Sequence, residues 1–191
     1  MSHITDLHIQ QFRGLRNLHL SNLGQINLLV GANNSGKTSV LEAIATYCRP
    51  LDPWEWLNAA RSREIKSSRI SILESFTWLF PQAASNSANG LYQGQIVMTG
   101  NGDVPVREVV ATLHEILVES IQENENSYDD ERFDESSVIV RGADVTVHAK
   151  MNMMQPSLFS NNGAMTETLT FQLREDERFV HDKKAVYQCW Q

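Results

Sequence analysis

Eight consecutive residues carry the clearest chemical signal in this chain of 191 residues. They read Gly31-Ala32-Asn33-Asn34-Ser35-Gly36-Lys37-Thr38 and satisfy the pattern G-x-x-x-x-G-K-[ST] at every fixed position. Gly31 and Gly36 permit backbone angles that a side chain would oppose, so the main chain can approach an anion closely. Lys37 adds a positive charge and Thr38 adds a hydroxyl. This combination predicts a cradle for phosphate groups.

A strand before this loop and a helix after it are needed to position these groups. Residues 26–30 (INLLV) predict a short buried strand, and residues 38–45 place Val40, Leu41 and Ile44 at helical spacing. The loop amides and the free amides at the helix N-terminus would then point at one anion. We therefore expect the chain to bind a nucleoside triphosphate. A Gly-Asn-Ser turn that merely caps a helix is the alternative interpretation.

The motif assigns a role to individual residues. We expect Lys37 to reach the β- and γ-phosphates of ATP and to act in catalysis, and the Thr38 hydroxyl to coordinate Mg²⁺. Gly31 and Gly36 would bind the nucleotide through the main chain. Position alone adds four further phosphate contacts, namely Asn33, Asn34, Ser35 and Ser39.

Length, composition and charge limit the class of protein. The length and the hydrophobic content of 41% suit one domain, or one domain with an inserted lobe. Cys48 and Cys189 are too few for a disulfide framework, so we expect a cytoplasmic protein, and no apolar run approaches the length of a membrane span. The net charge of −7 argues against a free-standing nucleic-acid binder. A local basic patch, read either as a DNA contact or as a solvated helix face, comprises Arg61, Arg63, Lys66 and Arg69.

The chain divides into residues 1–80, the phosphate-loop core, and residues 81–191, a β-rich lobe. Two strands at 4–12 and 15–20 are expected before the loop, and a second helix over 68–80 after it. Further strands are expected at 95–99, 106–114, 138–150, 166–173 and 180–190. Turn signals stand at Asn101-Gly102 and, more weakly, at Arg141-Gly142-Ala143-Asp144. An acidic insertion near 119–135 matches no calcium loop and is read as a solvated segment.

Residues 4–44 carry more than a generic phosphate loop. They contain a first strand with Phe12-Arg13, a short hairpin, the loop form G-x-N-x-S-G-K-[ST] and a helix that begins S-x-L-E-A-I. This combination resembles the start of the RecF/SMC/OLD branch of ABC-type ATPases. The compact loop and the short hairpin look closest to the OLD-like and phage-defence members.

The resemblance implies an α/β fold, the N-terminal lobe of a P-loop NTPase head of ABC type with an antiparallel β-rich segment. Such a head dimerises around ATP and Mg²⁺, so the resemblance implies a second ATPase head, in a homo-oligomer, as partner. It also implies a nucleotide contact for Arg13, whose alternative is a surface arginine beside a core phenylalanine. The Mg²⁺-sensing glutamine of such heads has two candidates here, Gln82 and Gln93.

The same resemblance implies a role in DNA repair or in antiviral defence. Relatives of this type often act beside a nuclease domain or subunit, and contact with DNA is a further expectation. No membrane partner is expected. These implications come from the resemblance in fold and not from the residues of a particular site.

Several motifs of a complete head are absent from the sequence. No run of four apolar residues ends in Asp-Glu, which would hold Mg²⁺ and supply the catalytic base, and no Ser-Gly-Gly signature follows. The sequence therefore predicts the front half of an ATPase head, without the C-terminal half. Two other functions stay open: a small P-loop kinase, and a non-catalytic scaffold whose assembly is stabilised by ATP.

We predict that this chain alone hydrolyses ATP slowly or not at all, because phosphoryl transfer requires the complete set of positioned charges. The measurement is release of phosphate under steady-state conditions, with Lys37→Ala as the control for contaminating ATPases. Turnover by the native chain that disappears in Lys37→Ala would contradict the prediction.

Overall fold

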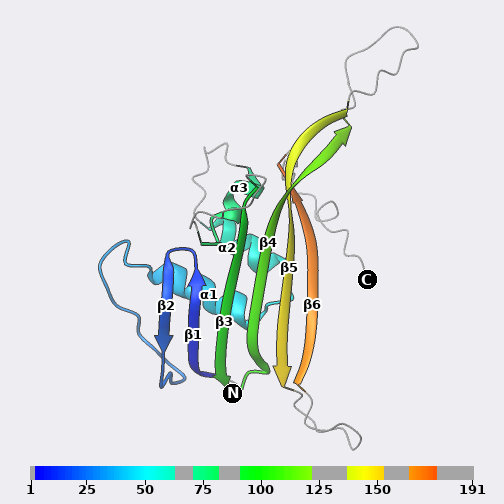
Figure 1. Ribbon diagram of the computed structural model, residues 1–191. Coiled ribbons are helices and arrows are strands. Elements are labelled where there is room, and N and C mark those ends of the chain that lie inside the picture. Colours follow the sequence, from blue (N-terminus) through cyan, green and yellow to red (C-terminus); the bar gives the residue numbers. More distant parts are fainter. Residues whose placement is uncertain (1–2, 63–70, 82–90, 122–136, 153–163, 176–191) are drawn as a thin grey trace, which may run out of the picture.

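The computed structural model describes residues 3–62, 71–81, 91–121, 137–152 and 164–175 (Figure 1). Its centre is a six-stranded antiparallel sheet with the strand order β2-β1-β3-β4-β5-β6. The strands are β1 (Ile4–Phe12), β2 (Leu15–Leu20), β3 (Gln93–Gly102), β4 (Val106–Ile121), β5 (Ser137–Asn152) and β6 (Ala164–Arg174). The chain leaves the sheet after β2 and returns at β3 to pair with β1, and the described residues in between form three helices. The first hairpin and the later β-rich segment thus share one sheet.

Three helices accompany the sheet: α1 (Lys37–Cys48), α2 (Pro53–Arg61) and α3 (Ile72–Thr77). Side chains alternate between the two faces of a strand, and on β3, for example, Ile96 and Met98 are fully buried while Val97 is half-buried. The buried rows of neighbouring strands form one core with α1, α2 and α3. In Figure 1 the helices lie behind the sheet. Phe76 of α3, for instance, meets Phe171 of β6 edge to face, with ring centroids 5.6 Å apart.

Helix α1, which follows the phosphate loop, is fixed to the sheet by Tyr47. The Tyr47 hydroxyl donates a hydrogen bond to the Val106 carbonyl at 2.8 Å, and the side chain is fully buried. Gly100 of β3 makes room for this ring, since a Cβ at that position would lie 2.7 Å from the Tyr47 oxygen. The contact sets the height of α1 above the sheet and therefore the place of the loop that precedes it.

Helix α2 was not predicted, although the sequence carries its start signal. Asp52 is the N-cap, with its carboxylate accepting from the Trp54 amide at 3.0 Å, and Pro53 occupies the first helical turn. Pro53 therefore lies at the start of a helix. Trp56 is fully buried, and its indole N–H donates to the Pro50 carbonyl at 2.8 Å.

The predicted strand at 26–30 is wrong. These residues form an irregular segment in which the side chains of Ile26, Leu28 and Val30 are 94%, 87% and 76% exposed. The physical reason is that a strand needs a neighbour for its backbone groups. Nothing in the described sheet pairs with this segment. The apolar run is real, but the sheet that would bury it is not formed by the described residues.

Most of the other predicted strands are present in the structure. The strands at 4–12 and 15–20 are confirmed, and the four strands expected between 95 and 173 are present with longer bounds. A hairpin connection follows Asn101-Gly102, but at residues 103–105, because these two residues are still part of β3 and pair with β1. The turn at 141–144 is wrong, because Gly142 lies inside β5, opposite Ile116 and Arg174. Helix α3 covers six residues of the expected 68–80. The strand at 180–190 lies outside the described residues, and so does most of the acidic insertion.

Strands β4 and β5 continue beyond both of their neighbours. β3 pairs with β4 as far as His114, and β6 pairs with β5 from Gly142 onward. Beyond these two positions, as far as Ile121, β4 and β5 pair only with each other among the described residues. This part of the two strands forms a two-stranded arm (Figure 1). The arm exposes Leu117 and Ile139.

The described part of the chain contains no helix that is both long and apolar enough to cross a membrane.

We predict that stability falls as the pH rises from about 10 to about 12, because burial raises the pKa of Tyr47 to about 12. Burial also raises the pKa of Tyr92 to about 12. A folded-state pKa above the unfolded value of 10 contributes stability that is complete below pH 10 and is lost as the pH passes the folded value. Tyr47→Phe should lose about 1–2 kcal/mol at pH 8, since the Val106 carbonyl loses its donor.

The measurement is denaturant unfolding at pH 8, 10 and 11.5 for the native chain, Tyr47→Phe and Tyr92→Phe. Each variant should show a smaller loss of stability with pH than the native chain. Equal pH slopes in all three proteins would contradict the assignment.

Candidate nucleotide-binding site

The phosphate loop bends sharply into the first turn of α1. Gly36 is the N-cap residue of α1 and has a φ of 88°, in the left-handed region where a side chain is disfavoured. Asn34 has a φ of 62°, a conformation that asparagine tolerates better than most residues. The Ser35 amide donates to the Ala32 carbonyl at 3.3 Å and closes the turn. Because no side chain caps α1, its first amides are available to an anion.

Lys37 folds back across the loop. Its ammonium group donates to the Gly31 carbonyl at 2.8 Å and to the Ala32 carbonyl at 2.6 Å. An ammonium has three donor hydrogens, so these two bonds leave a third for a ligand. Gly31 faces the same space, since a Cβ there would lie 2.8 Å from the Ser35 hydroxyl oxygen. The lysine is therefore held over the loop before any phosphate arrives.

The loop forms one wall of an open cavity of about 760 Å³. The other walls come from the turn between β1 and β2 and from the end of α2. The lining residues are Gly14, Leu15, Asn33, Asn34, Ser35, Gly36, Lys37, Thr38, Ser39 and Ser62. Among them Lys37 is the one charged side chain, so the lining favours a polyanion. This volume lies in the range of small-molecule and cofactor sites.

The chemistry of the lining fits a triphosphate better than it fits an isolated metal ion. Within the parts of the chain that the structure describes, no three His, Cys, Asp or Glu residues lie together as a metal site. Thr38 supplies a hydroxyl at the cavity, so a Mg²⁺ ion would be held by Thr38 and by the phosphates that it accompanies. Gln82, the expected Mg²⁺ sensor, lies outside the described residues. Gln93 is the exposed first residue of β3 and does not line the cavity.

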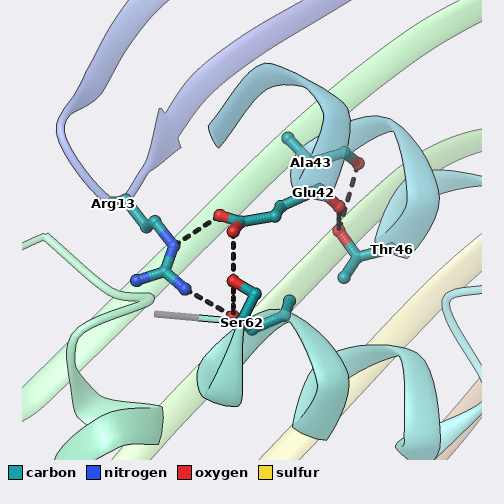
Figure 2. Close-up of polar contacts among 6 residues, drawn as sticks. Arg13, Glu42, Ala43, Thr46 and Ser62 are labelled. Atoms are coloured by element: carbon teal, nitrogen blue, oxygen red, sulfur yellow. Dashed lines mark hydrogen bonds and ion pairs between the residues drawn. The ribbon is translucent and has the colours of Figure 1, made fainter. Parts of the chain in front are cut away.

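Arg13 and Glu42 form a buried ion pair behind the cavity (Figure 2). The Arg13 Nε donates to Glu42 Oε2 at 2.7 Å, and each side chain is 8% exposed. The guanidinium Nη2 also donates to the Ala59 carbonyl at 2.5 Å, and the Arg13 amide donates to the Leu79 carbonyl at 2.6 Å. Arg13 has a φ of 52°, which costs about 1 kcal/mol for a residue with a Cβ. The pair thus links the β1–β2 turn to α1 and α2.

Glu42 uses its second oxygen to hold Ser62, which lines the cavity. The Ser62 hydroxyl donates to Glu42 Oε1 (Figure 2). Ser62 is also the C-cap residue of α2, and its amide donates to the Asn58 carbonyl at 2.9 Å. One carboxylate therefore connects the helix that follows the phosphate loop with the part of the cavity lining that comes from the end of α2.

The structure brings most of the sequence-predicted residues together. Seven of them line the cavity, namely Asn33, Asn34, Ser35, Gly36, Lys37, Thr38 and Ser39, and Gly31 contacts Lys37 through its carbonyl. Their binding of nucleotide stays a prediction. The Arg13 guanidinium is directed to Glu42 and Ala59, and its nucleotide contact also stays a prediction. Of the basic patch, Arg61 ends α2, and its three other members lie outside the described residues.

Sequence reasoning missed Gly14, Leu15, Glu42 and Ser62. A signal for Glu42 existed, because it is a single carboxylate on the apolar face of a helix, between Val40 and Ala43. Such a charge needs a partner when it is buried. No local signal identified Ser62, since its place in the cavity depends on how α2 folds back toward α1.

We predict that Arg13→Ala and Glu42→Ala each destabilise the chain by about 3–5 kcal/mol, because each leaves a buried charge without its partner. The double variant should be much less destabilised than the sum of the two. The control pair is Arg49–Glu55, whose side chains are 69% and 21% exposed and whose loss should cost about 1 kcal/mol or less. Additive effects of the Arg13 and Glu42 substitutions in urea unfolding would contradict the assigned ion pair.

Comparisons with known proteins agree with this geometry. Residues 3–74 match the family described as AAA ATPase domain. The chain is 54% identical over 44 residues to the uncharacterized protein MJECL10 of Methanocaldococcus jannaschii, which covers 23% of the chain and 20% of that protein. It is also 54% identical over 44 residues to the DNA replication and repair protein RecF of Nitrosococcus oceani, covering 23% of the chain and 12% of the relative.

A third relative is the RecF protein of Saccharophagus degradans, 45% identical over 51 residues, or 26% of the chain and 14% of the relative. The matched segments thus span a fifth or less of the length of these relatives. No solved structure gives a significant match. Together the domain match and the RecF relatives support a P-loop ATPase head of ABC type in the N-terminal part of the chain.

Proposed function

We propose that this chain is the nucleotide-binding part of an ATPase head, and that it binds Mg-ATP through residues 31–39. The observation that carries the proposal is the cavity itself, in which Lys37, the loop and the uncapped N-terminus of α1 face one space. The lysine ammonium is positively charged, and the amides of the loop and of the helix N-terminus carry partial positive charge. The oxygen atoms of a polyphosphate are negatively charged and accept hydrogen bonds from such groups. Thr38 would complete the site by holding Mg²⁺ next to the phosphates.

We propose further that hydrolysis requires a polypeptide segment beyond the described residues. The support is a set of exposed apolar side chains before and after the loop. Ile26, Leu28 and Val30 precede it, and Leu41 of α1, which is 61% exposed, follows it. Exposed apolar side chains that gather on a surface mark sites of protein contact. The completing segment would supply the carboxylates for Mg²⁺ and the catalytic base, from the same polypeptide or from another one, and a second head would close the site.

The pathway is proposed from the relatives. Two of them are named DNA replication and repair protein, so we propose that the head serves a DNA-repair system, with DNA as a partner of the complete assembly. Coupling to a nuclease, and a role in antiviral defence, rest on the resemblance of residues 4–44 to OLD-like ATPases. Nucleotide-dependent association of two heads is the step that would transmit ATP binding to such a partner.

A scaffold that binds ATP without hydrolysing it is the second candidate. The observation in its favour is that no carboxylate lines the cavity among the described residues, while Glu42 is held by Arg13 and Ser62. Binding of ATP without turnover by the full natural protein, in the presence of its partners, would favour the scaffold over the ATPase.

We predict that the native chain binds Mg-ATP and that Lys37→Ala weakens binding roughly tenfold to a hundredfold, because a charge-assisted contact to phosphate is lost. Isothermal titration calorimetry is the measurement. Lys150→Ala is the matched control, since it removes an exposed lysine from β5, away from the loop. The absence of ATP binding by the native chain, or equal losses in both variants, would refute the proposed site.

A further inference from the structure

Ser62 occupies an unusual chemical position in the cavity wall. Among the described residues, the two protein atoms within hydrogen-bond distance of its hydroxyl oxygen are Glu42 Oε1 and the Ala59 carbonyl oxygen, the latter at 3.0 Å. Both are acceptors. A serine hydroxyl has one hydrogen to donate and two lone pairs to accept with. Its hydrogen is therefore used inside the protein, and only acceptor capacity remains for a ligand.

Ser62 thus offers a ligand a hydrogen-bond acceptor, whereas the phosphate loop offers hydrogen-bond donors. Lys37 and the amides at the start of α1 are donors, which suit the oxygen atoms of a polyphosphate. Phosphate oxygens that carry no hydrogen would face an acceptor at Ser62, which is unfavourable. The cavity lining thus combines donors for phosphates with an acceptor, at Ser62, for a group that carries a hydrogen.

Glu42 maintains this arrangement. Its Oε2 accepts from Arg13 and its Oε1 accepts from Ser62, so each oxygen has its own donor (Figure 2). The burial of Glu42 and Arg13 keeps water from competing for these bonds. The carboxylate therefore determines which way the Ser62 hydroxyl points.

We propose that Ser62 is a binding residue that accepts a hydrogen bond from the bound Mg-nucleotide, and that Glu42 is the residue that positions it. The ligand group is a hydrogen-bond donor: a ribose hydroxyl, an amino group of the base, or a water molecule on Mg²⁺. The inference rests on the proposed function, since it assigns a further ligand contact, at Ser62, in the same cavity. It makes Ser62 a determinant of which ligands the site prefers.

The test compares Mg-ATP with magnesium tripolyphosphate, which has the phosphates but no sugar or base. Ser62→Ala should weaken Mg-ATP binding roughly threefold to tenfold, as expected for one hydrogen bond, while Ser62→Thr keeps the hydroxyl and should bind as the native chain does. If the donor belongs to the ribose or base, Ser62→Ala binds tripolyphosphate normally. If the donor is a water on Mg²⁺, both ligands weaken by the same factor.

Glu42→Gln gives a second readout that loss of fold alone would not produce. Arg13 is a donor, so the new amide must turn its oxygen to Arg13 and its NH₂ to Ser62. The NH₂ then donates to the serine and occupies one of its two lone pairs, while the serine hydrogen turns to the Ala59 carbonyl. The serine keeps less acceptor capacity for a ligand, so Glu42→Gln should weaken the binding of Mg-ATP. Tripolyphosphate binds normally if the donor belongs to the ribose or base, and weakens by the same factor if the donor is a water on Mg²⁺.

Native affinity for Mg-ATP in Ser62→Ala, or equal weakening in Ser62→Ala and Ser62→Thr, would overturn the role of Ser62. Native affinity for Mg-ATP in Glu42→Gln would overturn the positioning role of Glu42. Failure of the native chain to bind either ligand would instead remove the proposed function, and this inference with it.

Discussion

The ion pair between Arg13 and Glu42 is the contact on which the geometry of the cavity depends. Arg13 stands at the tight turn between β1 and β2, and its backbone and side chain reach Leu79, Glu42 and Ala59. Leu79 lies just after α3, Glu42 lies in α1 and Ala59 lies in α2. A single residue therefore joins the edge of the sheet to all three helices. The left-handed backbone at Arg13 is a local cost that these bonds offset.

The same ion pair explains how two distant segments come to face each other. The phosphate loop precedes α1, and Ser62 ends α2, so their separation is set by how the two helices pack. Glu42 contacts the C-terminal end of α2 through Ser62 and is itself part of α1. Tyr47, further along α1, fixes the helix to the sheet from the other end. The cavity is thus held by two anchors on one helix, one ionic and one from a neutral hydroxyl.

The elements that the sequence predicted well are those that need only local information. The loop at 31–38, the helix after it and the hairpin of β1 and β2 follow from residue types at fixed spacing. The failures have a common physical cause. Residues 26–30 are apolar enough for a strand but have no described neighbour, and Gly142 resembles a turn residue but lies where three strands pair.

The candidate site could be predicted on one side only. Its loop wall follows from the motif, whereas Gly14, Leu15 and Ser62 enter through tertiary packing that no local pattern encodes. Arg13 shows the difference most clearly. Its residue type suits a phosphate contact, but the fold surrounds it with a carboxylate and two carbonyls, counting the one that its amide reaches.

The arm formed by β4 and β5 has a consequence for how this protein can be altered. Beyond His114 and before Gly142 the two strands pair with no third strand among the described residues, and the arm extends away from the helices (Figure 1). None of the described residues of the arm belongs to the core or lines the cavity. Positions of this kind accept added sequence well. The arm is the natural attachment point for a reporter or an affinity handle that must not disturb ligand binding.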